Sequence, residues 1–362
     1  MLRVAIIGCG KIADSHAAQI QRIKGCEIVG VCDREELLAG QLAERFRVKH
    51  CFVEAARLLA ECRPDVVHIT TPPQSHFALG KQCLDAGCHA YIEKPFTIDT
   101  LEAQQLITLA TQKSLVLTAG HNAQFTHAAR RMRRLIQDGY LGGPPIHMES
   151  SWCYDLEDPS YAKAVLGDQQ HWLRRIPGKL LQNIISHGIA HLAEFLPGES
   201  AQVMSHGFVS PLLRSIGEND IVDELRVIIV THNQTAYFTF SSQMRPSQRE
   251  FRIFGSKNGL VLDEDQQTLI KLSGSRYKSY AENFIPPLNL AKQYVGNWMH
   301  NMRLFLRNDF QSDSSKKYLF ESFYRSITNG APPPIPYREI LLTTRIMETI
   351  FEQLRLKTSV QS

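Results

Sequence analysis

Long basic runs are absent from the sequence, which contains no five consecutive Lys or Arg residues and has a formal net charge of only +4 over 362 residues. Binding along a nucleic-acid backbone typically needs a clustered basic surface. Nucleic acid is therefore not an expected partner.

Long apolar runs are absent too. A membrane-spanning helix needs roughly 18 consecutive apolar residues, whereas the longest runs here are strand-sized, such as Val227–Val230. The N-terminal stretch Met1–Gly8 is too short in its apolar part for a signal peptide and is interpreted as a strand. We therefore expect a soluble, cytoplasmic protein with no membrane partner.

Cysteine pairs with the C-x-x-C spacing are also missing, although the chain has eight cysteines, seven of them between Cys9 and Cys88. This usage is typical of a reducing compartment. We interpret most of these cysteines as small buried hydrophobic residues. A reactive thiol or a metal site is the alternative, and Cys9 is the one cysteine within an expected ligand loop.

The first third of the chain alternates short apolar runs with longer amphipathic segments, the pattern of a parallel sheet with crossover helices. The expected strands are Val4–Ile7, Ile28–Cys32, Val66–Ile69, Ala90–Ile92 and Leu115–Thr118. Expected helices between them include Glu35–Phe46, Ser75–Ala86 and Thr100–Gln112. The fold class is thus α/β, with a doubly wound parallel sheet, the Rossmann arrangement, over residues 1–122.

After Gly120 strand-like runs follow one another through turns, as in an antiparallel sheet. The expected strands are His147–Tyr154, Val203–Val209, Glu224–Thr231, Ala236–Ser241, Phe251–Phe254 and Leu260–Leu262, with a tight turn at Asn233-Gln234. Helices are expected near Leu288–Leu306, Ser315–Asn329 and Arg338–Leu356. This pattern indicates an α+β domain with a mainly antiparallel sheet.

The strand around Tyr237 alternates Tyr237 and Thr239 with Phe238 and Phe240, so aromatic rings point to both faces of the sheet. One set of rings needs a cover. We therefore expect a homo-oligomer, a dimer or a tetramer, that uses the open face of this sheet.

The loop Gly8-Cys9-Gly10-Lys11-Ile12-Ala13 has the G-x-G-x-x-A spacing of a dinucleotide-binding turn. Gly8 permits the tight turn from strand to helix, and Gly10 lets the backbone approach a pyrophosphate at the helix N-terminus. Ala13 is small enough for close packing of the helix on the strand. The loop therefore predicts a nicotinamide cofactor, bound through Gly8, Gly10, Lys11 and Ile12.

Asp33 ends the second strand 20 residues after Ala13, the spacing of a carboxylate that accepts hydrogen bonds from the ribose diol. This carboxylate would repel the 2′-phosphate of NADP. The adjacent Arg34 could instead stack on adenine or pair with that phosphate. We favour NAD, with NADP as the alternative.

Two further motifs follow later strands: residues 70–76 are Thr-Thr-Pro-Pro-Gln-Ser-His and residues 91–96 are Tyr-Ile-Glu-Lys-Pro-Phe. Together with the glycine loop, they resemble the Gfo/Idh/MocA family, named for glucose-fructose oxidoreductase and inositol dehydrogenase. The resemblance implies that these motifs lie beside the nicotinamide. The cofactor residues implied in this way are Thr71, Pro72, His76, Glu93 and Lys94.

The resemblance extends to the whole chain, because the family has a second domain with an open antiparallel sheet and a late helix that returns to the first domain. It implies an NAD(P)-binding Rossmann domain over 1–122, a substrate and oligomerisation domain over 123–337, and the returning C-terminal helix over 338–362.

Lys94 should reach a ligand, because ligands bind at the carboxyl ends of parallel strands. Its ammonium can hold a substrate oxygen and stabilise negative charge that develops there. A nearby positive nicotinamide would lower its pKa toward that of a base at neutral pH. We also expect the Lys94-Pro95 bond to be cis, because the chain must turn sharply there.

In the second domain the resemblance implies a Gly-rich turn followed by Asp-x-x-x-His, which completes the active site. The matching residues are Gly178, Asn183 and His187, so an asparagine stands where the family has aspartate. A spacing of four on a helix places Asn183 and His187 on one face. Asparagine can orient an imidazole, but it cannot stabilise imidazolium as a carboxylate does.

Further pocket candidates lie next to the matched segments, and each has a structural alternative. They are Asn122, Trp172, Arg174 and His191. His191 and Glu194 follow His187 at helical spacing, but residue 188 is glycine, so the H-E-x-x-H pattern of zinc hydrolases is missing. We expect no metal.

These observations predict an NAD-dependent dehydrogenase or reductase that acts on CH-OH groups. The substrate class, a secondary alcohol or carbonyl of a sugar, polyol or sugar derivative, comes from the resemblance. Lys94 and His187 would share proton transfer. The alternative is a dinucleotide-binding sensor or regulator of the same fold without turnover, and Asn183 is the residue that favours it.

Overall fold

The computed structural model describes residues 1–156, 166, 168, 171–274, 277–278, 280–310 and 313–361. The chain forms two compact units. The first comprises Met1–Asn122 and Asp313–Glu348, and the second comprises Ala123–Ser312 and Thr349–Ser362. Each unit has its own sheet.

The first unit contains a six-stranded parallel sheet in the order β3-β2-β1-β4-β5-β6. Its strands are β1 (Leu2–Ile7), β2 (Cys26–Cys32), β3 (Cys51–Phe52), β4 (Val66–Ile69), β5 (His89–Ile92) and β6 (Leu117–Ala119). This order confirms the expected doubly wound sheet, whose switch point lies between β1 and β4. The sequence pattern missed β3, because two residues are too few to show a period.

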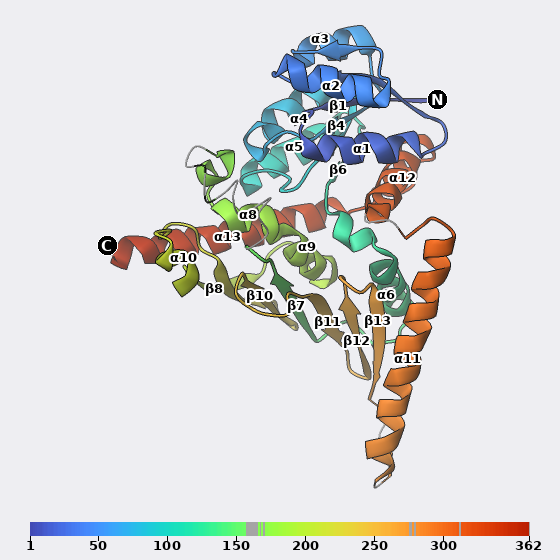
Figure 1. Cartoon of the computed structure of the whole chain (residues 1–362), viewed down its shortest axis with the longest axis vertical. Coiled ribbons are helices and arrows are strands. Elements are labelled where there is room, and N and C mark those ends of the chain that lie inside the picture. Colours follow the sequence, from blue (N-terminus) through green and yellow to red (C-terminus); the bar gives the residue numbers. More distant parts are fainter. Residues whose placement is uncertain are drawn as a thin grey trace. The chain divides into compact units, whose positions relative to one another are not determined.

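Helices connect these strands, as Figure 1 shows for α1 to α5. They are α1 (Lys11–Gln21), α2 (Glu36–Phe46), α3 (Ala55–Cys62), η1 (Pro73–Ser75), α4 (His76–Asp85) and α5 (Thr100–Gln112). Helix α5 begins where Asp99 accepts a hydrogen bond from the Glu102 backbone N–H at 2.8 Å, the usual N-cap interaction.

Helix α12 (Ser314–Thr328) also belongs to the first unit, although its position in the chain suggested the second domain. Its Phe320 ring lies edge-on to Tyr91 of β5, with centroids 5.0 Å apart, and Phe323 is fully buried. Helix α13 (Tyr337–Gln361) begins in this unit, where the Tyr337 hydroxyl accepts a hydrogen bond from Leu117 N, and its residues from Thr349 onward belong to the second unit.

The second unit contains a sheet with the order β13-β12-β11-β7-β10-β9-β8 among the described residues. Its strands are β7 (His147–Cys153), β8 (Gln202–Phe208), β9 (Glu224–Val230), β10 (Thr235–Ser241), β11 (Arg249–Phe254), β12 (Asn258–Asp263) and β13 (Thr268–Ser273). Neighbours pair antiparallel except β7 and β10, which are parallel. The expected α+β unit with a mainly antiparallel sheet is confirmed, and β13 is additional.

One face of this sheet is buried and the other is open. In β10, Phe238 and Phe240 are buried, whereas Tyr237 is 48% exposed. A tight turn joins β9 to β10, as the sequence predicted. A hydrogen bond from Thr231 N to Gln234 O closes it, so its central residues are His232 and Asn233 rather than Asn233 and Gln234.

Helices α6 and α9 pack against strands of the sheet, and α11 lies along the edge strand β13 (Figure 1). The described helices of this unit are η2 (Asn122–Phe125), α6 (His127–Gln137), η3 (Trp172–Arg175), α8 (Lys179–Ile184), α9 (Ser186–Phe195), α10 (Pro211–Ser215) and α11 (Ala281–Leu306). Across the described part of the chain, no helix combines the length and apolar character needed to cross a membrane.

Candidate active site

The glycine loop packs closely against the end of β4. Gly8 has a φ of +98°, a backbone conformation that favours glycine. A Cβ atom at Gly8 would lie 2.7 Å from the Thr71 nitrogen, and the Thr70 hydroxyl donates to the Gly8 carbonyl at 2.6 Å. No residue larger than glycine fits position 8.

Gly10 faces a different environment. It is the N-cap of α1, and a Cβ atom built there has no described atom within 4 Å. Ala13, one turn into the helix, is completely buried, as close packing of α1 on the sheet requires. The helix N-terminus therefore offers backbone N–H groups beside open space, which fits the pyrophosphate of a dinucleotide.

Asp33 connects the end of β2 to the glycine loop. Its Oδ2 accepts a hydrogen bond from Cys9 N at 2.6 Å, and its Oδ1 accepts one from Glu35 N at 3.0 Å. Each carboxylate oxygen can accept a second hydrogen bond. Since Asp33 is only half-buried and Arg34 is exposed, this carboxylate can also bind a ribose diol.

His76 joins the two proline-containing segments. It is completely buried, with Nε2 2.8 Å from the Thr71 carbonyl oxygen and Nδ1 3.0 Å from the Pro95 carbonyl oxygen. Burial lowers its pKa. His76 can thus position these loops from beneath, and its contact with the cofactor stays a prediction. Pro72 is exposed and Thr71 is half-buried.

The Lys94-Pro95 peptide bond is cis, as the sequence predicted. Lys94 follows Glu93, which comes directly after β5, and burial lowers the pKa of Lys94. The charge of Glu93 raises that pKa, whereas the charge of Lys316 lowers it further. These effects move Lys94 toward the neutral amine that a proton acceptor needs.

Glu93 is buried, and its two carboxylate oxygens are bound differently. Oε1 lies 2.9 Å from His16 Nε2, and Oε2 accepts the Lys94 backbone N–H at 3.0 Å. Burial raises the pKa of Glu93, but the hydrogen bond and charge of His16 and the charges of Lys316 and Lys94 outweigh it and lower the pKa to about 2. Glu93 is therefore an ionised group that holds the lysine segment, and its contact with the cofactor stays a prediction.

A chain of buried hydrogen bonds leads away from Glu93. His16 Nδ1 lies 2.9 Å from His68 Nδ1, and His68 Nε2 lies 2.8 Å from the Tyr324 hydroxyl of α12. Burial lowers the pKa of both histidines, which are therefore neutral at pH 7. Because an ionised carboxylate only accepts, Tyr324 donates to His68, His68 to His16, and His16 to Glu93. Sequence analysis missed these three residues.

The segment with Asn183 and His187 differs from the single helix that the sequence predicted. Helix α8 ends at Ile184 and α9 begins at Ser186, so Asn183 and His187 lie on two successive helices. Both side chains are half-buried. The His187 ring stacks on Trp152 of β7, with centroids 5.6 Å apart and ring planes 21° apart.

Gly188 explains why the chain comes so close to the sheet here. A Cβ atom at this position would lie 2.5 Å from the Phe238 ring and 2.6 Å from the Trp152 ring. The absence of a side chain lets the first turn of α9 pack directly on the two aromatic rings. His187 is consequently positioned by ring packing.

The remaining pocket candidates are occupied by structural interactions. His191 is buried beside Glu264, with Nε2 3.4 Å from Oε1, and Arg174 donates to Glu218 at 2.7 Å. Asn122 donates to the Ser315 hydroxyl at 2.8 Å, and the Trp172 ring lies 5.4 Å from that of His171. These contacts correct the assignment of His191, which lies in the core of the second unit.

Comparison with known proteins agrees with the site in the first unit. Residues 2–121 match the model of the GFO_IDH_MocA family, described as an oxidoreductase family with an NAD-binding Rossmann fold. The match covers the Rossmann unit, and this unit of the chain is therefore similar to the family. That unit, with its glycine loop and Lys94 segment, is an NAD-binding domain.

Relatives and a solved structure extend the similarity. A UDP-N-acetylglucosamine 3-dehydrogenase of Acidithiobacillus ferrooxidans is 36% identical over 149 residues, 41% of this chain and only 44% of that protein. A myo-inositol 2-dehydrogenase of Thermotoga maritima is 20% identical over 85% of this chain and 88% of that protein. The WlbA dehydrogenase of Bordetella pertussis, solved with NADH and UDP-GlcNAcA, has a TM-score of 0.75 at 14% identity and covers 98% of this chain and 95% of that chain, which shows a shared fold.

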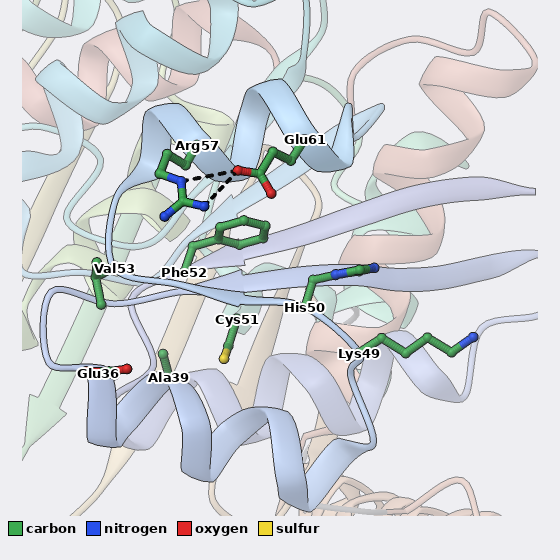
Figure 2. Close-up of a pocket in the computed structure, with 9 residues that line it drawn as sticks. All are labelled: Glu36, Ala39, Lys49, His50, Cys51, Phe52, Val53, Arg57 and Glu61. Atoms are coloured by element: carbon green, nitrogen blue, oxygen red, sulfur yellow. Dashed lines mark hydrogen bonds and ion pairs between the residues drawn. The ribbon is translucent and has the colours of Figure 1, made fainter.

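Other features of the chain lie away from the site. A hollow of about 370 Å³ lies beside β3, and its lining includes none of the predicted site residues. Figure 2 shows the residues that line it, among them Arg57, which pairs with Glu61. Burial raises the pKa of Cys9 to about 12, so this thiol is protonated and unreactive at pH 7. Among the described residues, no group of three His, Cys, Asp or Glu side chains could hold a metal ion.

Proposed function

We propose that this protein is an NAD-dependent oxidoreductase that transfers hydride between nicotinamide and a secondary alcohol or carbonyl of a sugar, polyol or sugar derivative. The observation that most supports this is Lys94. It follows the parallel sheet at the carboxyl end of β5, burial lowers its pKa, and Glu93 binds its backbone. Carboxyl ends of parallel strands are where ligands of such folds bind.

The cofactor site would consist of residues from three segments of the first unit. Gly8, Gly10, Lys11 and Ile12 would hold the pyrophosphate at the start of α1, and Asp33 would accept hydrogen bonds from the ribose. Arg34 would lie at the adenine, and Thr71 and Pro72 beside the nicotinamide. NAD is preferred to NADP because the carboxylate of Asp33 occupies the diol position.

Lys94 would act on the proton of the reacting hydroxyl. In the oxidation direction its neutral Nζ accepts that proton, and in the reduction direction its ammonium returns it. Bound NAD would supply the hydride acceptor. The ammonium also stabilises negative charge that develops on the substrate oxygen.

His187, in the second unit, would share proton transfer with Lys94, and Asn183 would orient its imidazole. Stacking on Trp152 supports a fixed orientation of the ring. Asn183 supplies an amide in place of a carboxylate, and an amide stabilises a protonated imidazole less than a carboxylate does.

The substrate class rests on the relatives, whose names specify UDP-N-acetylglucosamine, myo-inositol and D-glucoside as compounds that they oxidise. We further propose a cytoplasmic homo-oligomer, a dimer or a tetramer, without nucleic-acid or membrane partners. The net charge of +4 and the partly exposed Tyr237 on the open sheet face support these proposals.

A panel of sugars, polyols and nucleotide sugars, each incubated with NAD or NADP, tests the function. We expect absorbance of the reduced cofactor to appear with at least one substrate, faster with NAD. Calorimetric titration of NAD provides the parallel binding measurement. If NAD binds and no substrate on the panel reacts, the catalytic proposal is wrong.

The second candidate, a dinucleotide-binding sensor without turnover, is favoured by Asn183. The Asn183→Asp variant distinguishes the two, because a carboxylate there raises the pKa of a neighbouring imidazole. In an enzyme we expect the variant to shift the pH profile of existing turnover upward. In a sensor, wild type is inactive, and activity appears only in Asn183→Asp.

A further inference from the structure

Helix α11 contacts the sheet of the second unit with its amide side chains. Gln293 accepts a hydrogen bond from Lys271 N at 2.7 Å and donates to Lys271 O at 3.1 Å. One helical turn later, Asn297 accepts from Leu269 N at 3.1 Å and donates to Leu269 O at 3.0 Å. The two amides thus pair with alternate residues of β13 and satisfy the edge of the sheet as a further strand would.

The side of α11 away from β13 is apolar. A stripe with alternating spacings of four and three residues runs along the helix, and it consists of Phe284, Leu288, Ala291, Val295, Trp298, Met302 and Phe305. All seven residues are exposed, with Phe284 at 69%, Trp298 at 64% and Phe305 at 65%. We call these seven residues the α11 stripe.

This arrangement inverts the usual amphipathic helix, which buries its apolar face and exposes its polar one. The stripe and its exposed neighbours present on the order of 1,000 Å² of side-chain surface, since each large aromatic ring contributes about 150–250 Å². A soluble monomer rarely exposes so large a continuous apolar patch. A stable dimer buries about 800 Å² on each partner, so the patch is large enough for one.

The sequence of the stripe is complementary to itself when two copies run antiparallel. With Val295 opposite Val295, Phe284 faces Phe305 and Leu288 faces Met302 of the other copy. The small Ala291 then faces the large Trp298. Pairing a small side chain with a large one fills the space between two helices.

We propose that the α11 stripe is an interface between two copies of this chain, packed antiparallel about a two-fold axis at Val295. The spacing of four and three residues is the one by which two helices interlock their side chains. In Figure 1 the helix extends beyond the end of β13, so part of the stripe lies clear of the sheet of its own unit. This interface is separate from the open sheet face, and the two together would produce a tetramer.

Light scattering of the full chain after size exclusion, at micromolar concentration, tests the interface. We expect wild type to have a mass that is a multiple of 41.0 kDa and Val295→Glu to have half that mass. A glutamate at the centre of an apolar interface should weaken association by about 100-fold or more. Asn289→Glu, on the same helix at an exposed position outside the stripe, should leave the mass unchanged.

Cysteine substitution tests the antiparallel register. Phe284→Cys and Phe305→Cys together should form a disulfide between copies on mild oxidation, whereas neither single variant should. Thermal unfolding and NAD titration of each variant confirm that it is folded. A wild-type monomer of 41.0 kDa, an unchanged mass in Val295→Glu, or flotation of monomeric wild type with phosphatidylcholine–phosphatidylglycerol vesicles would overturn the proposal.

Discussion

Among the described residues, each unit of the molecule buries one pair of a histidine and a glutamate, and the two pairs behave in opposite ways. In the first unit His16 and Glu93 are 2.9 Å apart, and the pKa of Glu93 is lowered to about 2. In the second unit His191 and Glu264 are 3.4 Å apart, and burial raises the pKa of Glu264 to about 8. The glutamates are almost equally exposed, at 6% and 7%.

Burial therefore does not decide the charge of these carboxylates; their partners do. Glu93 accepts hydrogen bonds from His16 and from the Lys94 backbone, with the positive charges of Lys316 and Lys94 nearby. For Glu264, the charge of Arg249 lowers the pKa less than burial raises it. Burial also lowers the pKa of His191 to about 4, so this second pair is neutral at pH 7. The pair beside the proposed reactive lysine thus contains an ionised glutamate and a neutral histidine, whereas both members of the pair in the core of the second unit are neutral.

The largest expected effect is a loss of turnover, and it should occur when the lysine beside Glu93 is changed but not when Glu264 is changed. Lys94→Ala should reduce turnover by roughly 100-fold or more, because it removes a positioned acid-base and charge-stabilising group, and should leave NAD affinity within a few-fold. Glu264→Gln is the matched control and should keep wild-type turnover. The rate of NADH formation measures both. Undiminished activity in Lys94→Ala would remove this lysine from the mechanism.

Stability against pH should distinguish the two glutamates. Glu264 has a folded pKa above its unfolded value, so its contribution to stability is present below about pH 4.5 and is lost as the pH rises through about 8. The loss is at most about 1.4 kcal/mol per pH unit. Glu264→Gln cannot ionise, and the variant should gain stability relative to wild type between pH 5 and pH 9 in urea unfolding.

Glu93 has the opposite dependence, because its folded pKa lies below its unfolded value. Its contribution is present above about pH 4.5 and is lost as the pH falls toward 2. Glu93→Gln should therefore lose stability relative to wild type at pH 7 and approach it at low pH. If the stabilities of Glu93→Gln and Glu264→Gln, each relative to wild type, changed with pH in the same direction, the proposed difference between the two pairs would be wrong.

Glu93→Gln should also change the titration of the adjacent lysine. The negative charge of Glu93 raises the pKa of Lys94, so its removal lowers that pKa further. We expect the acid limb of the turnover profile for alcohol oxidation to move to lower pH by about one unit. A merely structural role of Glu93 would reduce the rate at every pH without moving the limb, and Glu264→Gln should leave the limb in place.

The sequence predicted the features that depend on neighbouring residues. The structure contains the tight turn at Gly8 and the cis bond before Pro95 that the sequence predicted. Asp33 accepts a hydrogen bond from Cys9 N, which the sequence did not predict, and its contact with the ribose stays a prediction. The stack of His187 on Trp152 lay outside such reasoning, because the partner belongs to a distant strand. The break at Ile185 was missed because both flanking segments have helical composition.

The buried chain from Tyr324 to Glu93 could not be predicted for the same reason. Tyr324 and His68 are 256 residues apart, and their hydrogen bond depends on α12 packing in the first unit. The sequence of α11 shows the spacing of its apolar residues, but it does not show which side of the helix contacts the sheet. The pairing of Gln293 and Asn297 with the edge of β13 decides it.

A third carboxylate, Asp33, can be compared with the two glutamates, and its replacement should have the smallest effect, which is on cofactor affinity. Its partners are two backbone N–H groups rather than a histidine, and it is only half-buried, so it can bind a ligand while holding the glycine loop. Asp33→Ala should weaken NAD binding by about tenfold, since ribose hydrogen bonds are lost, and should weaken NADP binding less, because repulsion of the 2′-phosphate is lost as well. The preference for NAD should narrow or reverse in parallel titrations of both cofactors. Glu264→Gln should leave both affinities unchanged. An equal loss for NAD and NADP would mean that Asp33 only fixes the loop through Cys9 and does not distinguish the two ribose groups.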